Sequence, residues 1–385
     1  MHIAATLVGS VLILAVLKDA FEAVVLPRRV EGRFRISAWF YRGVGVPWFK
    51  LAGNIQSTGR RENFLAYFGP LSLILLLVLW AFGLILGFAL LQYGSGEHLH
   101  LVGEPVTFGT LVYLSGETFF TLGYGDIVPA SSLSRALAVL EAGMGFAFLG
   151  TVVGYLPTIY SAFSRREVQI SLLDAYAGSP PTATELLARL GTSEQRLLDQ
   201  LFRDWEKTAS DVLESHISYP PLCFFRSQHR NQSWLTALTA ILDATSLVIA
   251  GVEGLASDQA RLTFSMARHA LVDLSQLVNA RYDANYPDRL SAEEALRLRN
   301  GLSERGLELK QGADFEEQLL TLRAMYEPYA HAVGRALVIA LPPWVAAEKK
   351  RDNWQVGPWD RALQASSLAG LGHRADTHKR PEDHF

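Results

Sequence analysis

The 385-residue chain has little cysteine and little charge. Its single cysteine, Cys223, excludes an intrachain disulfide framework and a cysteine-based metal cluster. Charged residues make up only 19% of the chain and the net charge is −3, so the composition predicts no nucleic-acid partner. The low charge accompanies 49% hydrophobic residues and a mean hydropathy of +0.15, which favour a membrane part joined to a soluble part.

The region after Ser164 lacks the common signatures of catalysis and nucleotide binding. It contains no P-loop and no strand–G-x-G-x-x-G–helix unit, so a dinucleotide-binding regulatory domain is not expected. No local motif supplies a nucleophile with its base, and we predict neither enzyme activity nor an organic cofactor. The cysteine and the histidines of this region lack the spacing of a zinc site; they are His216, Cys223, His229 and His269.

Lysine and arginine are absent from residues 62–134 and frequent on the N-terminal side of that gap. Because short cytoplasmic loops of membrane proteins are enriched in these cations, we expect the preceding linker and the C-terminal part to be cytoplasmic. The linker also contains many aromatic residues, which is typical of a segment on anionic lipid, although nucleic-acid binding uses a similar composition. Its cations are Arg28, Arg29, Arg33, Arg35, Arg42, Lys50, Arg60 and Arg61.

Three apolar segments have the length of membrane helices. Leu65–Leu91 contains no charged residue and exceeds the roughly 20 residues that a helix needs to cross a bilayer. Ala136–Phe163 is interrupted only by Glu141, and an ionisable residue inside a span suggests a function. Ile3–Leu26 opens the chain and is interpreted as a retained membrane helix, with a cleaved signal peptide as the alternative.

The first segment contains three charged residues, Lys18, Asp19 and Glu22. Lys18 and Glu22 are four residues apart, so they share a helix face and can pair. Two interpretations stay open: an intramembrane charge coupled to gating, or charges at the membrane interface near the helix end.

The most informative motif lies between the second and third apolar segments. Residues 121–126 read T-L-G-Y-G-D, and they follow Thr118 and an apolar stretch, Val106–Phe120, that is too short to cross a bilayer and favours a re-entrant helix. Backbone carbonyls replace the water shell of K⁺ when successive residues point them at one axis. Gly123 and Gly125 can adopt a positive φ without a Cβ penalty, as this geometry requires.

This motif between two long apolar helices resembles the pore of bacterial two-transmembrane-helix potassium channels. The resemblance implies a selectivity filter formed by Thr121, Leu122, Gly123, Tyr124 and Gly125. K⁺ would bind the carbonyls of the first four residues and the Thr121 hydroxyl, and Tyr124 would point away from the pore. A filter needs four loops around one axis, and the motif occurs once, so the resemblance implies a homotetramer.

The resemblance also assigns roles around the filter. Glu117 and Asp126, like Thr118, would support it: they stand at the offsets at which carboxylates of these channels approach each other and share a proton or a water. The alternative is that Asp126 is solvated at the outer mouth and attracts cations. In the third apolar segment, Gly145 stands where related channels hinge. Gly150 and Pro157 are further gating candidates, although glycines serve close helix packing equally well.

Helical periodicity continues through the C-terminal part. It predicts helices over Glu185–Leu190, Glu194–Leu213, Leu235–Leu255, Ala260–Tyr282 and Phe315–Ile339. Within these, Leu235–Val252 is apolar enough for a fourth membrane span, with a buried bundle helix as the favoured interpretation. The predicted architecture is therefore a membrane all-α, pore-loop tetrameric channel with an extra N-terminal helix and a mainly helical cytoplasmic domain.

The predicted boundaries follow from these segments: an N-terminal transmembrane helix (1–27), a basic and aromatic cytoplasmic linker (28–63), a pore domain (64–164), a helical cytoplasmic domain (165–366) and a disordered tail (367–385). Within the pore domain we expect an outer helix (64–92), a pore helix (106–120), the filter (121–126) and an inner helix (134–163).

We therefore expect a potassium-selective channel in the cell membrane, in contact with lipid and gated through an unknown cytoplasmic ligand. The alternatives are a membrane sensor that retains a pore-like scaffold and a weakly selective cation channel. No helix has an arginine at every third position, so the sequence predicts no voltage sensor.

Overall fold

The fold is taken from a computed structural model that describes residues 2–26, 35–96, 99–101, 107–191, 195–229, 231–282 and 284–346. The chain forms two compact units. The first is drawn from Met1–Asn54, Asn63–Ala162 and Ile217–Phe225, and the second from Ile55–Glu62, Phe163–His216 and Arg226–Phe385. The predicted linker cations Arg28, Arg29 and Arg33, the start of the predicted pore helix at Val106 and the tail 367–385 lie outside the described residues.

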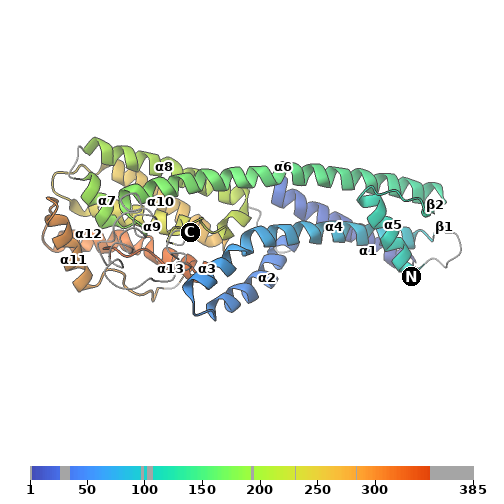
Figure 1. Ribbon diagram of the computed structural model, residues 1–385, viewed down its shortest axis with the longest axis horizontal. Helices are drawn as coiled ribbons and strands as arrows, with labels where there is room; N and C mark the ends of the chain where they lie inside the picture. The colour runs from blue at the N-terminus through green and yellow to red at the C-terminus, as the bar shows by residue number, and fades with distance from the viewer. Residues whose placement is uncertain are drawn as a thin grey trace, which may run out of the picture. The chain divides into compact units, whose positions relative to one another are not determined.

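The first unit is built mainly of helices (Figure 1), as the predicted all-α membrane class requires. They are α1 (His2–Ala20) with a π-helical turn η1 (Phe21–Val25), α2 (Ile36–Gly53), α4 (Phe68–Gly94), α5 (Phe108–Phe119) and the first part of α6 (Ser132–Ala177). The helix α3 (Thr58–Ala66) contributes residues to both units. By length and composition, His2–Val24, Thr58–Gly94 and Ser132–Ala177 can each cross a membrane.

Two short strands accompany the re-entrant segment, and hydropathy did not predict them. Strand β1 (Leu99–Leu101) pairs antiparallel with β2 (Ile127–Pro129), with Leu99 opposite Pro129 and Leu101 opposite Ile127. The pairing places the segment before α5 beside the segment that follows the loop after α5. Strands of three residues are too short for a period-two pattern to be visible in the sequence.

Helix α1 packs closely along α4, and glycines allow that approach (Figure 1). A Cβ added at Gly87 would lie 2.5 Å from Cγ1 of Ile13, and one added at Gly94 would lie 2.1 Å from Oγ1 of Thr6. Small residues bring membrane helices near enough for van der Waals contacts to stabilise their association. Val16 is buried in the same contact. The extra N-terminal helix is therefore an integral part of the first unit.

Asp19 joins three helices of this unit. Its carboxylate accepts hydrogen bonds from the backbone N–H of Ser37 at 2.9 Å, the Ser37 hydroxyl at 3.0 Å and the indole N–H of Trp80 at 2.9 Å. Asp19 is only 3% exposed, and three donors offset much of the cost of removing a carboxylate from water. Lys18 and Glu22 form the expected pair, with 3.7 Å between Nζ and Oε1.

Helix α6 is longer than the inner helix that hydropathy predicted. It begins at Ser132, continues through Pro157 without interruption, and ends only at Ala177. The apolar run stops near Phe163, but helical backbone does not require apolar residues, so hydropathy marks the limit of the span and not the end of the helix. The last part of α6 belongs to the second unit.

The second unit is a helical bundle around α9 (Trp234–Gly251). All of α9 is buried, although its length and composition would also suit a membrane span. Its neighbours in the unit are α7, α10, α12 and α13, so the bundle-helix interpretation explains its apolar character. The other helices are α7 (Ala183–Leu190), α8 (Gln195–Ser218), α10 (Asp258–Leu277), α11 (Ala292–Ser303), α12 (Ala313–Ala324) and α13 (Glu327–Leu337).

The prediction of a single helix over Phe315–Ile339 is wrong about the number of helices. The chain forms two helices there, α12 and α13, which are separated at Met325 and Tyr326. Pro328 stands in the first turn of α13, where its missing N–H would be unpaired in any case, whereas in one continuous helix its ring would clash with the Ala324 carbonyl four residues earlier. Apolar periodicity continues across this break, which is why it suggested one element.

Candidate functional site

The loop after α5 has an alternating backbone. Thr121, Gly123 and Gly125 have φ values of 56°, 63° and 75°, whereas Leu122 and Tyr124 are not among the positive-φ residues. Alternation between left- and right-handed residues turns successive peptide groups so that their carbonyls face one side and their N–H groups the other. The predicted requirement for positive φ at the two glycines is therefore present in the backbone.

Thr121 also has a positive φ, which the positions of the glycines did not predict. A β-branched side chain at φ 56° is uncommon and costs of order 1–3 kcal/mol. The backbone around it is held by α5: the N–H of Thr121 donates to the Thr118 carbonyl at 3.1 Å, and that of Leu122 donates to the Glu117 carbonyl at 2.9 Å. The end of the pore helix thus fixes the first residue of the loop in this conformation.

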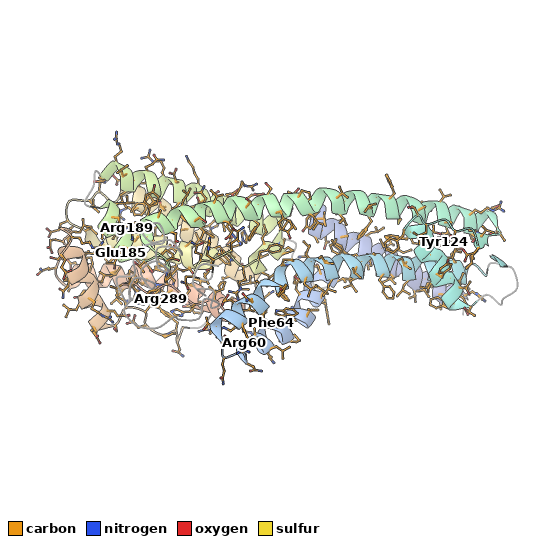
Figure 2. The ribbon with its side chains drawn as sticks, viewed as in Figure 1. Arg60, Phe64, Tyr124, Glu185, Arg189 and Arg289 are labelled. Atoms are coloured by element: carbon orange, nitrogen blue, oxygen red, sulfur yellow. The ribbon has the colours of Figure 1, made fainter. Side chains whose placement is uncertain are left out.

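The loop lies open in the single chain. The exposed fractions of Leu122 and Tyr124 are 54% and 69%, and nothing lies within 4 Å of a Cβ added at Gly123 or Gly125. Figure 2 labels Tyr124 in the part of the first unit in which Figure 1 labels α5. Large apolar and aromatic side chains with this exposure mark a surface that another molecule covers.

Glu117 supports the loop from behind. It is 5% exposed, and its Oε1 accepts a hydrogen bond from the N–H of Gly125 at 3.2 Å, so the carboxylate spans the loop from α5 to its far end. Asp126 is exposed and interacts with the Tyr113 side chain. The proton or water that Glu117 and Asp126 would share stays a prediction, as do the filter roles of residues 121–125.

Glu141 has a partner that sequence analysis did not identify. Its Oε1 is hydrogen-bonded to the hydroxyl of Ser115, and that hydroxyl also lies 2.7 Å from the carbonyl of Ile85. The Ser115 hydroxyl is thus the donor to both oxygens, which share its proton in a three-centre hydrogen bond. The group joins α6, α5 and α4 directly behind the pore-helix region.

The two glycines proposed as hinges have different surroundings. A Cβ added at Gly145 would lie 1.9 Å from the carbonyl oxygen of Phe119, at the end of α5. Around Gly150 the same construction meets nothing within 4 Å in the single chain. Gly145 is therefore a site of close packing between α6 and α5, and the hinge roles of Gly145, Gly150 and Pro157 stay predictions.

No group of three or more His, Cys, Asp or Glu side chains that could hold a metal ion occurs among the described residues. The loop offers backbone carbonyls, and carbonyl oxygens in general suit weakly bound, hard cations.

Residues 74–161 match the family described as "Ion channel", and the match covers most of α4, all of α5, the loop and α6 to Ser161. The chain is 24% identical over 221 residues to the uncharacterized membrane protein YdjJ of Bacillus subtilis, an alignment that spans 56% of this chain and 61% of the relative. It is 28% identical over 123 residues to protein LctB of Geobacillus stearothermophilus, covering 29% of this chain and 91% of that protein. No solved structure matches.

Proposed function

We propose that this protein, whose residues 74–161 match the family described as "Ion channel", conducts K⁺ selectively as a homotetramer. The observation that carries the proposal is the alternating backbone of Thr121-Leu122-Gly123-Tyr124-Gly125, with positive φ at each second residue. Such a loop offers successive carbonyls on one side. Four copies around an axis would provide rings of oxygen atoms for a dehydrated K⁺ ion.

Assembly of copies is supported by the surface of α6. Large apolar side chains on its membrane part are exposed in the single chain, among them Phe146 at 74%, Val139 at 74% and Val153 at 64%. Lipid can cover part of such a surface, but the exposed filter residues need a polar, ordered environment that lipid does not provide. Other copies of α6 and of the filter loop would cover both surfaces.

The orientation of the pore rests on the distribution of cations. Lysine and arginine are absent from residues 62–134; they are frequent before that gap, Arg135 follows it alone, and the next cations are Arg165 and Arg166. The filter loop would therefore open to the outside, and the second unit would be cytoplasmic. This sidedness agrees with a filter at the outer end of a potassium pore.

The proposal is tested by the reversal potential of the purified full-length protein in a planar bilayer between K⁺ and Na⁺ solutions. A reversal close to the K⁺ equilibrium potential supports the selective channel. Equal permeation of the two ions would support the weakly selective cation channel instead. If the protein is reconstituted and tetrameric but passes no current under any applied voltage, the sensor with a pore-like scaffold gains support.

A further inference from the structure

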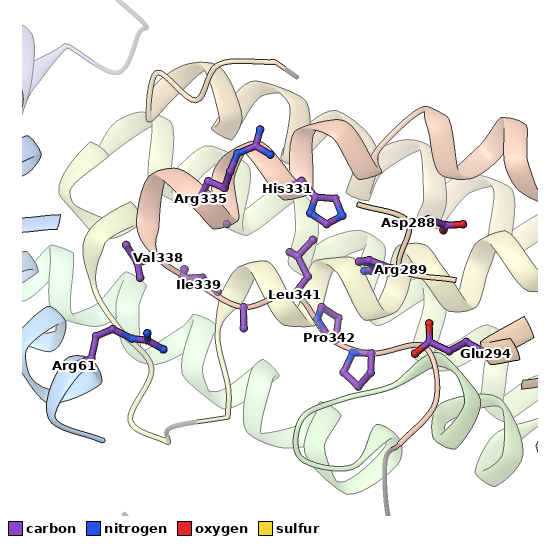
Figure 3. A pocket seen from close by; sticks show the side chains of 13 residues that line it. Arg61, Asp288, Arg289, Glu294, His331, Arg335, Val338, Ile339, Leu341 and Pro342 are labelled. Carbon is purple, nitrogen blue, oxygen red and sulfur yellow. The ribbon is translucent and has the colours of Figure 1, made fainter. Parts of the chain in front are cut away.

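The second unit contains a cavity of about 670 Å³ between α3, the end of α13 and the strap that follows it (Figure 3). We use "strap" for residues 338–343. Its side chains Leu341, Pro342 and Pro343 form an apolar part of the lining, and Arg61 approaches from α3. The volume falls in the range of roughly 300–1,000 Å³ that small-molecule sites occupy.

The charged lining of the cavity is dominated by arginine. Arg61, Arg289 and Arg335 all line it, and Figure 3 shows Arg289 and Arg335 on one side of the strap and Arg61 on the other. Of the two lining carboxylates, Asp288 already pairs with Arg323. Arg289 is 8% exposed and holds Asp243 through Nη2 at 2.6 Å, while its Nη1 is buried and makes no hydrogen bond. A buried guanidinium N–H without an acceptor is costly, and a ligand oxygen would satisfy it.

His331 provides an independent sign of the same polarity. Its ring stacks on Tyr286 with centroids 5.4 Å apart, and its buried Nε2 makes no hydrogen bond. Burial, followed by the positive charges of Arg289, Arg335 and Arg323, lowers the pKa of His331 from 6.5 to about 4. The three arginines therefore lie close enough to the imidazole to disfavour its protonation.

The strap is tied to the segment that leads into the outer pore helix. Arg226 pairs with Glu62 of α3, with 3.5 Å between Nη1 and Oε2. The same guanidinium donates through Nη2 to the carbonyl of Leu337 and, at 3.2 Å, to that of Val338. Val338 has φ 54° and ψ 50°, a left-handed conformation that is strained for a β-branched residue. A strained residue on the wall of a cavity, linked to Glu62 of α3 through Arg226, is suited to respond to what fills the cavity.

We propose that this cavity binds a small phosphate-bearing organic anion, with Arg61, Arg289 and Arg335 as its charged contacts and the strap as the surface for its apolar part. Guanidinium groups match phosphate oxygens in geometry and charge. Because Arg61 and Glu62 directly precede α4 along the chain, the bound anion would bias the position of the outer helix. That second step rests on the proposed channel function, whereas binding itself does not.

Two sources offer this chemistry, a soluble nucleotide and an anionic lipid headgroup, and calorimetry distinguishes them. Full-length protein in nanodiscs of zwitterionic lipid is titrated with ATP and, separately, with dioctanoyl phosphatidate. Saturable binding of either probe supports the site and identifies the source. If neither probe binds at millimolar concentration, the proposal is overturned.

Single variants locate the binding. Arg61→Gln and Arg335→Gln each remove one charged contact, and each should weaken the affinity about tenfold or more. Arg60→Gln is the matched control, because Arg60 is exposed, neighbours Arg61 and is absent from the cavity lining (Figure 2). An equal loss in the Arg60 variant would mean general charge attraction and would reject the cavity as the site.

Coupling is measured separately through single-channel open probability with and without the probe that binds. The probe should change the open probability of the unmodified protein, and Glu62→Gln should reduce this response while its affinity stays within about twofold of the original. An unchanged open probability despite binding would refute the coupling to α4. Failure to conduct K⁺ would reject the channel proposal and leave the calorimetric result intact, so the two failures are distinguishable.

Discussion

Helices α6 and α9 have similar apolar character and opposite surroundings. Both qualify by length and composition as membrane spans, yet 11% of the most apolar window of α6 is buried, against 100% for α9. The apolar side chains of α9 are covered by helices of their own unit, whereas those of α6 need lipid or further copies of the chain. The apolar surface of α6 therefore has to be covered from outside the single chain, whereas that of α9 is covered within it.

The buried carboxylates differ in the same way. In the first unit, Asp19 is held by neutral donors from a backbone amide, a hydroxyl and an indole. In the second unit, Asp243 is held by the Arg289 guanidinium and by the Tyr326 hydroxyl at 2.5 Å. A charged residue is costly inside a bilayer. Neutral donors are therefore less costly partners for Asp19 than a cation would be.

The largest effect is expected from a substitution in the predicted filter loop of the first unit. Gly123→Ala places a Cβ at φ 63°, where an L-residue is disfavoured by about 1–2 kcal/mol, and distorts the carbonyl ring in all four copies. We expect loss of K⁺-selective current with the tetramer retained, measured in planar bilayers and by size-exclusion chromatography. Gly43→Ala is the control, since Gly43 is helical and nothing lies within 4 Å of its added Cβ. Normal selectivity in the Gly123 variant would contradict the assigned filter.

The second prediction sets α9 against α6 directly. Leu242 in α9 is 0% exposed, and Leu242→Ala should lower the free energy of unfolding of the second unit by about 2–5 kcal/mol. Phe146 in α6 is 74% exposed, so Phe146→Ala should leave that unfolding unchanged and shift the oligomer toward smaller species. Chemical denaturation and native mass spectrometry measure the two quantities. Destabilisation of the second unit by the Phe146 variant would break the comparison.

The third prediction concerns Glu141 and its bond to Ser115. Glu141→Ala leaves the Ser115 hydroxyl without this partner in a buried site and should destabilise the pore region by about 1–3 kcal/mol. Glu141→Gln keeps an acceptor oxygen in a side chain of similar shape and should behave like the unmodified protein, because its amide oxygen can accept from the Ser115 hydroxyl. The lifetime of the tetramer in detergent on heating measures the difference. A Gln variant as weak as the Ala variant would contradict a stabilising role for this hydrogen bond.

The smallest effect is a pH dependence of the second unit. The pKa of His331 is lowered from 6.5 to about 4 in the folded chain, so between these values the unfolded chain binds a proton that the folded chain does not. This contribution to stability is present above pH 6.5 and should be lost as the pH falls toward about 4. In His331→Gln, the thermal midpoint should decline less over that window. Parallel curves for the two proteins would show that His331 titrates normally.

Local patterns were sufficient to predict the parts of the pore. Residues 121–126 and their flanking apolar segments indicated a re-entrant helix followed by a loop with positive φ at Gly123 and Gly125, and the backbone has both features. Such requirements are local, because a positive φ needs glycine or incurs strain, and a span needs a certain number of apolar residues. The break between α12 and α13 was missed because the apolar periodicity continues across the two non-helical residues, Met325 and Tyr326.

Tertiary structure decided which distant groups meet. The sequence alone determined the span positions, the filter loop and the helical character of the C-terminal part. Folding decided that Glu141 meets Ser115, that Asp19 meets Trp80, that α9 lies inside a bundle, and that Arg61 shares a cavity with residues of α13. Pairs so far apart in the chain leave no periodic signal. Their meeting follows from the packing of whole helices, which depends on all their contacts together.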